Sequence, residues 1–330
     1  MRRLIACWMS LLMCAAMAAA PTLAQAPPAK GPTFPSKPLR IVVPFGAGGI
    51  ADLTARTVAQ HMAASLGQPV VIDNRPGAGG VVAAEMVAKA EPDGHTLLLL
   101  SNGSAVSAGL FKSLPYDTVR DFAPVGMLGT FDLVIVAAAE SKFNSLNDLL
   151  AYARANPDKL NLGSINIGST QHLAAELFKS MAGVSLQVVP FNGTPAVVTA
   201  LLGKQVDAAI EILGPILPQI QSGALRALAV TGERRAATLP TVPTAVEGGL
   251  GGFVVSSWNA LASPAKTPVA VVEQLNRALQ AALSDPAVAK RLRELNVEPH
   301  PGAPGQAAQH LASEIRRWGA VITRAGIPLQ

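Results

Sequence analysis

Residues 39–52 read LRIVVPFGAGGIAD, and this stretch decides the fold because a strand, a turn and a helix meet within it. Its first five residues are mostly apolar and β-branched, which is typical of a strand buried on both faces. Glycines then form a turn, and the residues after Asp52 place apolar side chains at helical spacing as far as Leu66. We expect Asp52 to be the N-cap of this helix and Gly67 to end it. A buried strand followed by an amphipathic helix is the repeating unit of an α/β fold.

The same alternation of strand and helix continues along the chain. Helical stretches separate further apolar runs of strand length, which occur at residues 70–72, 96–100, 133–138, 160–163, 186–189, 206–210 and 225–230. One of these helices is expected to have Thr194 as its cap, because Thr194 is followed by a proline, which suits the first helical position. The pattern predicts an α/β protein with mainly parallel sheets.

Two extended segments, residues 131–139 and 253–263, bracket a group of strand–helix units in the middle of the chain. A chain that crosses into a second lobe and later returns has this pattern. We therefore predict two lobes joined by a hinge of two crossing segments. Lobe 1 is predicted to contain residues 25–137 plus 257–330, and lobe 2 residues 138–256.

The N-terminus predicts export. Two arginines precede an apolar run over residues 4–20, and small residues follow, as in a secretory signal peptide. We expect residues 1–24 to be removed by cleavage after Ala24, which places the protein in the periplasm; an uncleaved anchor helix is the alternative. Both cysteines of the chain lie in this leader, so the mature protein is expected to have no disulfide.

Composition and charge exclude several classes of protein. Half of the 330 residues are apolar and only 14% are charged, which excludes a disordered chain. The leader contains two arginines and no acidic residue, so its removal lowers the net charge from +5 to +3. Such a small charge, without a dense block of lysine and arginine, predicts no nucleic-acid partner. We expect a monomer.

Glycine-rich turns stand between candidate strands and helices at four places. They are residues 44–52, 75–80, 163–170 and, more weakly, 191–194. Glycine lets the backbone approach a ligand closely, and the free N–H groups at a helix start favour an anion. Any single turn of this kind is more often only a tight connection. Four of them at the carboxyl ends of strands, two with Ser or Thr at the helix start, favour a cleft that holds an oxyanion.

Signals for catalysis are weak. No complete dinucleotide fingerprint, phosphate loop or nucleophile elbow occurs, and the five histidines lack metal-ligand spacing. An exported hydrolase with Ser164 or Ser169 as nucleophile and His172 as base would lack the third, orienting group. His172 is better explained as a capping or core residue, with ligand contact as the alternative. We therefore expect no enzymatic activity, no cofactor and no metal.

Several motifs occur in the order in which a known family has them. They are PSKPLRIVVPF (35–45), GGxxD (48–52), NRPGAGG (74–80), PDGHTL (92–97), GSTQHLA (168–174), PFNGTPA (190–196), LPQIQSG (217–223), LRALAVT (225–231) and LPTVPT (239–244). On these motifs the chain resembles the tripartite tricarboxylate transporter substrate-binding proteins, the Bug family of periplasmic receptors, from about Pro35 to Ile327.

The resemblance implies a two-lobed, type II-like periplasmic binding protein that closes on a small organic carboxylate. It also implies delivery of the ligand to a two-component membrane permease, or docking on a membrane sensor as the alternative. Main-chain groups and ordered waters would hold most of the ligand. From the loops and the resemblance together, the expected ligand-binding residues are Phe45, Gly46, Ala47, Gly48, Gly49, Asp52, Ser164, Asn166, Gly168, Ser169, Thr170, His172, Asn192 and Trp258.

The chain departs from the pattern of the family at positions next to the expected ligand. Ile50 stands where a third glycine is common, Ala51 where Ser or Thr is common, and Asn166 where glycine is frequent. These changes predict an altered ligand preference on an unchanged fold. An N-cap carboxylate at Asp52 would lie close to the bound anion, so we expect the ligand to bond the amides nearer residues 45–49.

Overall fold

Strand β1 and helix α1 form where the first strand–helix pattern predicts them. In the computed structural model, which describes residues 34–330, β1 spans Leu39–Val43 and α1 spans Ile50–Leu66. The helix ends at Gly67, whose φ of 68° is a left-handed conformation that glycine adopts without strain. The predicted signal peptide and its cleavage site lie outside the described residues.

The remaining elements continue the alternation. They are β2 (Val70–Asn74), η1 (Ala78–Gly80), α2 (Val81–Ala88), β3 (Thr96–Ser101), α3 (Asn102–Leu110), β4 (Phe122–Ala138), α4 (Leu146–Ala155), β5 (Asn161–Ile165), α5 (Thr170–Ala182), β6 (Gln187–Phe191), α6 (Thr194–Leu202), β7 (Ala208–Ile212), α7 (Leu213–Gln221), β8 (Leu225–Val230), β9 (Ser256–Pro264), α8 (Val269–Ser284), α9 (Pro286–Glu294), β10 (Val297–Pro299) and α10 (Pro304–Arg324). Every apolar run that the sequence singled out overlaps a strand. The short β10 has no counterpart among the predicted strands.

The strands of the described residues form one sheet in the order β2-β1-β3-β9-β4-β7-β5-β6, with β8 and β10 paired to β4. Strand β1 is parallel to β2 and β3, and β5 is parallel to β6 and β7. All pairings of β4 and β9 are antiparallel. The prediction of mainly parallel sheets is therefore correct only for the outer strands. The central strands differ because they carry the chain in opposite directions between the lobes.

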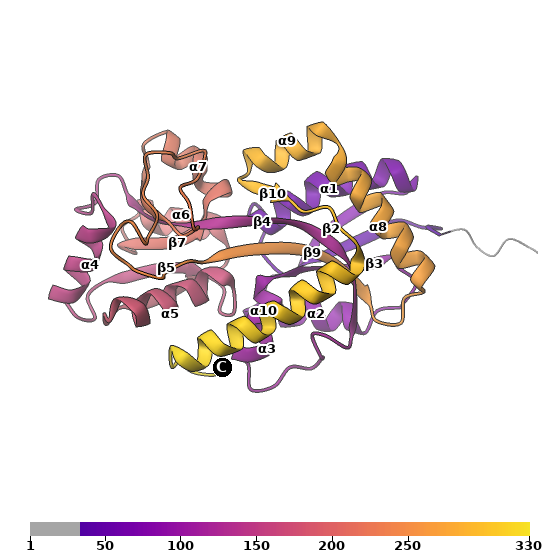
Figure 1. Cartoon of the computed structure of the whole chain (residues 1–330), viewed down its shortest axis with the longest axis horizontal. Coiled ribbons are helices and arrows are strands. Elements are labelled where there is room, and N and C mark those ends of the chain that lie inside the picture. The colour runs from indigo at the N-terminus through magenta and orange to yellow at the C-terminus, as the bar shows by residue number, and fades with distance from the viewer. Residues whose placement is uncertain (1–33) are drawn as a thin grey trace, which may run out of the picture. The chain divides into compact units, whose positions relative to one another are not determined.

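Strand β4 is long enough to serve both lobes. Its residues 122–132 pair with β9, and its residues 133–138 pair with β7 and β8. Figure 1 shows β4 and β9 crossing the middle of the molecule, with β5, β7 and α4–α7 at one end and β2, β3 and α1 at the other. We call residues 35–132 and 256–330 the first lobe, and residues 133–255 the second lobe. A two-lobed α/β fold with two crossing segments is thus confirmed.

Two helices that border the space between the lobes begin one or more residues earlier than expected. The N-cap of α1 is Gly49, and Asp52 lies three residues into the helix, so the prediction of an Asp52 cap is wrong. The N-cap of α6 is Gly193, not Thr194. The φ of Gly193 is 98°, a conformation that a residue with a side chain rarely adopts. Glycine therefore occupies the N-cap, and the side chain of Thr194 is available for another contact.

Helix α10 packs along the first lobe and reaches the start of α3. Its side chains Leu311, Trp318 and Ile322 are buried and share one face of the helix, being seven and four residues apart. Nε1 of Trp318 donates a hydrogen bond to Oδ1 of Asn102, the first residue of α3, at 2.6 Å. Residues 35–330 form one compact unit, and no helix within the described part of the chain is long and apolar enough to cross a membrane.

Candidate ligand-binding site

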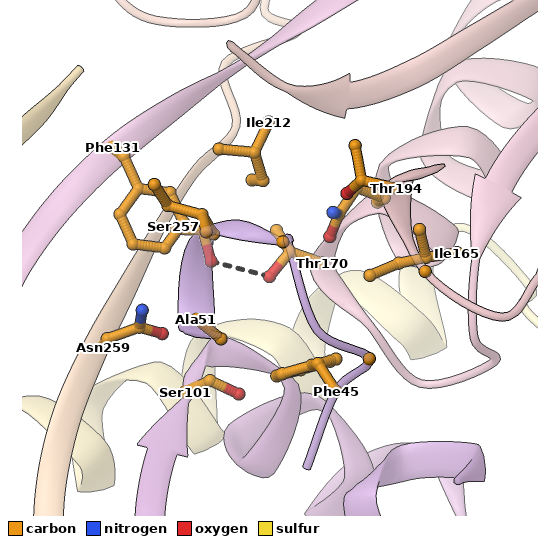
Figure 2. A pocket seen from close by; sticks show the side chains of 15 residues that line it. Phe45, Ala51, Ser101, Phe131, Ile165, Thr170, Thr194, Ile212, Ser257 and Asn259 are labelled. Atoms are coloured by element: carbon orange, nitrogen blue, oxygen red, sulfur yellow. Dashed lines mark hydrogen bonds between the residues drawn. The ribbon is translucent and has the colours of Figure 1, made fainter. Parts of the chain in front are cut away.

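A cavity lies between the two lobes, against β4 and β9. Its lining residues (Figure 2) are Phe45, Gly46, Gly49, Ile50, Ala51, Ser101, Phe131, Ser257 and Asn259 from the first lobe, and Ile165, Thr170, Gln171, Gly193, Thr194 and Ile212 from the second. The cavity volume is about 30 Å³, whereas roughly 10–15 Å³ is needed for each water molecule. In this form the cavity therefore has room for only a few water molecules.

Five helices begin at the wall of this cavity. The N-caps of α1, α3, α6 and α7 line it, and so does the first residue of α5; these residues are Gly49, Ser101, Gly193, Ile212 and Thr170. The first N–H groups of a helix have no partner within the helix and carry partial positive charge. Among the described residues, no lysine or arginine lines the cavity. An anion bound there would therefore be held mainly by backbone amides.

The carboxylate of Asp52 organises the glycine loop that precedes α1. It accepts hydrogen bonds from the amide of Gly48 at 3.0 Å and from Nε of Arg56 at 2.9 Å. Burial opposes ionisation of Asp52, but these bonds and one from Asn74 outweigh it and lower the pKa of the carboxyl. Asn74 also donates to the carbonyl of Phe45 at 3.1 Å. The Gly48 amide is thus used within the protein, and Arg56 balances the charge of Asp52.

Behind the second-lobe wall lies the side chain of Glu211, near the end of β7. Its Oε2 accepts hydrogen bonds from Nε2 of Gln171 at 3.3 Å, from Oγ1 of Thr194 at 3.2 Å and from the amide of Ile212 at 3.1 Å. Its Oε1 has no hydrogen-bond partner among the described residues. Burial raises the pKa of Glu211 to about 7, although the three hydrogen bonds oppose the rise.

Hydrogen bonds join the two lobes around the cavity. The amide of Gly79 donates to the carbonyl of Ile167 at 2.6 Å. Nδ2 of Asn102 donates to Oγ1 of Thr170 at 3.1 Å, and the same Oγ1 lies 2.9 Å from Oγ of Ser257 (Figure 2). These bonds connect α5 of the second lobe to α3 and β9 of the first, so the structure represents a form with the lobes closed.

The predicted ligand-binding residues divide into two groups. Those that line the cavity are Phe45, Gly46, Gly49 and Thr170. Those that lie beside or behind its wall are Ala47, Gly48, Asp52, Ser164, Asn166, Gly168, Ser169, His172, Asn192 and Trp258. The predicted set is larger than the lining set because the prediction included every residue of each loop. In the structure, mainly the residues at the helix starts face the cavity. Trp258, for example, packs edge-on against His310 on the face of β9 opposite Ser257.

The two serines of the hydrolase alternative have structural hydrogen-bond partners, and the histidine is buried. Oγ of Ser169 caps α5 by accepting the amide N–H of His172 at 3.1 Å, and it donates to the carbonyl of Ile165 at 3.3 Å. Oγ of Ser164 is buried and donates to that same carbonyl. Burial lowers the pKa of His172 to about 4. The burial of His172 matches the core interpretation of this residue, whereas the cap of α5 is Ser169.

Several residues of the cavity wall were not predicted from the sequence. Gln171 stands at a helix start between the predicted site residues Thr170 and His172, and Ser101 stands at a helix start directly after the predicted strand 96–100. Ser257 and Asn259 are two apart in the apolar strand β9, and polar residues at this spacing share one face. Alternation within that crossing segment was therefore the signal that could have located them.

The chain is similar to known proteins over most of its length. The family described as "Tripartite tricarboxylate transporter family receptor" matches residues 54–327. Protein BugT of Bordetella pertussis is 38% identical over 307 residues, which cover 92% of this chain and 94% of BugT.

Solved structures extend the likeness to three dimensions. The periplasmic binding protein BugD has a TM-score of 0.87 at 35% identity, covering 90% of this chain and 100% of BugD. The protein Rpa4515 of R. palustris, solved with adipate, has a TM-score of 0.86 at 35% identity, covering 90% of this chain and 99% of Rpa4515. With its fold and most of its length shared in this way, the chain belongs to the tripartite tricarboxylate transporter receptor family, among the Bug periplasmic binding proteins.

Proposed function

We propose that this protein captures a small organic carboxylate in the cavity between its lobes and delivers it to a two-component membrane permease. The observation that carries the proposal is the meeting of five helix starts at a cavity without lysine or arginine. Amides fixed in this way stabilise a carboxylate without the desolvation cost of a buried cation. The description of the family as transporter receptors and the adipate-bound relative support it. We further propose that the protein performs no chemistry and acts as a periplasmic monomer after removal of its leader.

Capture requires the lobes to open and close about β4 and β9. We propose a hinge where β4 changes partners, between Asp132 and Leu133, and where β9 begins at Ser256. This lies within a few residues of the sequence-based boundaries at 137 and 256. Closure excludes water and brings the helix starts of both lobes onto one ligand. The proposed contacts are the lining residues at those helix starts together with Ser257 and Asn259.

A panel of organic acids tests the carboxylate site. At a ligand concentration of 100 times Kd, binding is expected to stabilise the protein by about 2.7 kcal/mol. That corresponds to a rise in Tm of roughly 5 °C for a chain of this size. Thermal unfolding should be followed for protein purified from periplasm, with mono-, di- and tricarboxylates and with their neutral amides. A panel in which no acid raises Tm, or in which the amides raise it equally, contradicts the proposal.

Ser101 is expected to contact the ligand directly. Its Oγ is buried in the cavity wall and forms no hydrogen bond with the described residues. Ser101→Ala should therefore weaken binding about tenfold, because a hydrogen bond to a charged group contributes roughly 1.5–3 kcal/mol. The Tm of the ligand-free protein should change by less than about 2 °C. Isothermal titration calorimetry with the best acid of the panel measures the change.

Ser104→Ala is the matched control for Ser101→Ala. Ser104 lies in the same turn of α3 but does not line the cavity, and its Oγ accepts the Ser101 amide at 3.3 Å. Its removal should leave the affinity within about twofold. Equal losses of affinity in the two variants would show that the turn, and not the Ser101 hydroxyl, matters for binding.

A further inference from the structure

The carboxylate of Glu211 places a negative charge behind the second-lobe end of the cavity, although the helix starts around the cavity otherwise favour anions. The side chain of Glu211 is 0% exposed. Its Oε2 accepts three hydrogen bonds, and the three donors lie at the starts of three helices. They are the side chain of Gln171 in the first turn of α5, the hydroxyl of Thr194 at the start of α6, and the amide of Ile212 before α7. A carboxylate of the protein itself thus occupies the position at which these helix starts would hold an anion.

The hydrogen bonds of Glu211 also set the polarity of the wall in front of it. An ionised carboxylate only accepts hydrogen bonds. Thr194 must therefore direct its one hydroxyl hydrogen to Glu211, which leaves the lone pairs of Oγ1 for the cavity that Thr194 lines. While Glu211 is ionised, this end of the cavity therefore accepts a hydrogen bond from a ligand and lies close to a negative charge.

In the described part of the chain, no element packed against β7 supplies a cation that offsets that charge. Strands β4 (from residue 133) and β5 and helices α6 and α7, which pack against β7, contain no titratable side chain, and β4 places Val134 opposite Glu211. Helix α5 contributes His172, Glu176 and Lys179, none of which forms an ion pair with Glu211. The groups that face the carboxylate are the neutral donors already named.

We propose that Glu211 acts as a specificity residue that selects a ligand with a carboxylate at the first-lobe end and a hydrogen-bond donor, a hydroxyl or an amine, at the second-lobe end. A second carboxylate at that end would meet both a wall that accepts hydrogen bonds and an unbalanced negative charge. Glu211 does this from behind Thr194 and Gln171, so it is a positioning residue. The inference rests on the proposed function, and it predicts a preference that differs from a simple dicarboxylate such as adipate.

Matched pairs of acids test this assignment. The pairs are succinate with 4-hydroxybutanoate, glutarate with 5-hydroxypentanoate, and adipate with 6-hydroxyhexanoate; each pair differs only in the group at one end. Calorimetric titration at pH 8.5 is expected to show that the hydroxy acid of the best-binding length binds the wild type at least tenfold more tightly than its dicarboxylate partner. Glu211→Gln, which removes the charge but keeps the shape, should reduce that ratio at least tenfold.

Asp207→Asn is the control for a lost negative charge. Asp207 precedes the same strand, and its Oδ2 accepts the amide of Asn161 at 2.9 Å, away from the cavity lining. This variant should keep the wild-type ratio. A ratio that Glu211→Gln leaves unchanged, or a wild type that favours the dicarboxylate, overturns the role of Glu211 while the carboxylate receptor stands. If no acid of any length binds folded protein, the proposed function fails and the inference fails with it.

A second measurement needs no variant and covers the case in which Glu211→Gln does not fold. Protonation of Glu211 removes its charge, and the raised pKa of this carboxyl places that change near neutral pH. His172, whose pKa burial lowers, stays neutral from pH 6 upward. The wild-type preference for the hydroxy acid over the dicarboxylate should therefore decrease at least threefold from pH 8.5 to pH 6. A ratio that is constant over this range contradicts the proposal.

Discussion

Gly168→Ala is expected to weaken carboxylate binding by at least a hundredfold, roughly 2.7 kcal/mol. Gly168 precedes α5 on the second lobe, and a Cβ added to it would lie 2.7 Å from Cα and 3.1 Å from the amide nitrogen of Gly79 on the first lobe. Backbone atoms of two lobes cannot remain at such distances. The methyl group would hold the lobes apart and break the hydrogen bond from Gly79 to Ile167. Closure, and with it the gathering of helix starts around the ligand, would be lost.

Gly183→Ala is the matched control for this substitution. Gly183 ends the same helix with a φ of 62°, and Gly168 has a φ of 83°, so alanine is strained by roughly 1–2 kcal/mol at both positions. No heavy atom lies within 4 Å of a Cβ at Gly183. Both variants should therefore lose similar stability without ligand, and only Gly168→Ala should lose affinity in calorimetry. Equal affinities of the two variants would exclude contact between Gly168 and Gly79 as a requirement for binding.

The stability of the ligand-free protein, relative to Glu211→Gln, is expected to fall by roughly 3 kcal/mol from pH 4 to pH 8. Burial raises the pKa of Glu211 from 4.5 in the unfolded reference to about 7 in the folded protein. Between these two values the folded chain binds more protons than the unfolded chain, so its free energy of unfolding decreases as the pH rises. Glutamine has no proton to lose, and the variant lacks this decrease.

Urea denaturation of both proteins at pH 4, 5, 6, 7 and 8 measures this effect. Comparison with the variant at each pH cancels the contributions of the other titrating groups. A difference in the free energy of unfolding that does not change with pH would show that the folded protein does not hold the Glu211 proton more tightly. That result would also remove the basis for expecting a pH-dependent ligand preference.

The glycine loop before α1 illustrates how far local pattern predicts a site. The apolar run, the glycines and the helical spacing after them correctly predicted a strand, a turn and a helix. The same pattern misplaced the cap at Asp52, because a carboxylate close to a helix start fits both the N-cap and the third position. The hydrogen bonds of the Asp52 carboxylate to the amide of Gly48 and the guanidinium of Arg56 distinguish the third position from the N-cap. Both contacts depend on the folded loop.

Local signals along the chain by themselves determined the alternation of strands and helices and the two crossing segments, and they located the glycine-rich turns where an anion site is predicted. Such features need only the residues within one turn or one strand. Tertiary structure alone decided which residues meet: Ser101, Gln171 and the pair Ser257 and Asn259 come together at one cavity although these three places are far apart in the chain. It also placed Glu211 behind Thr194, since burial and hydrogen bonding of a carboxyl depend on packing between separate elements and leave no mark on local periodicity.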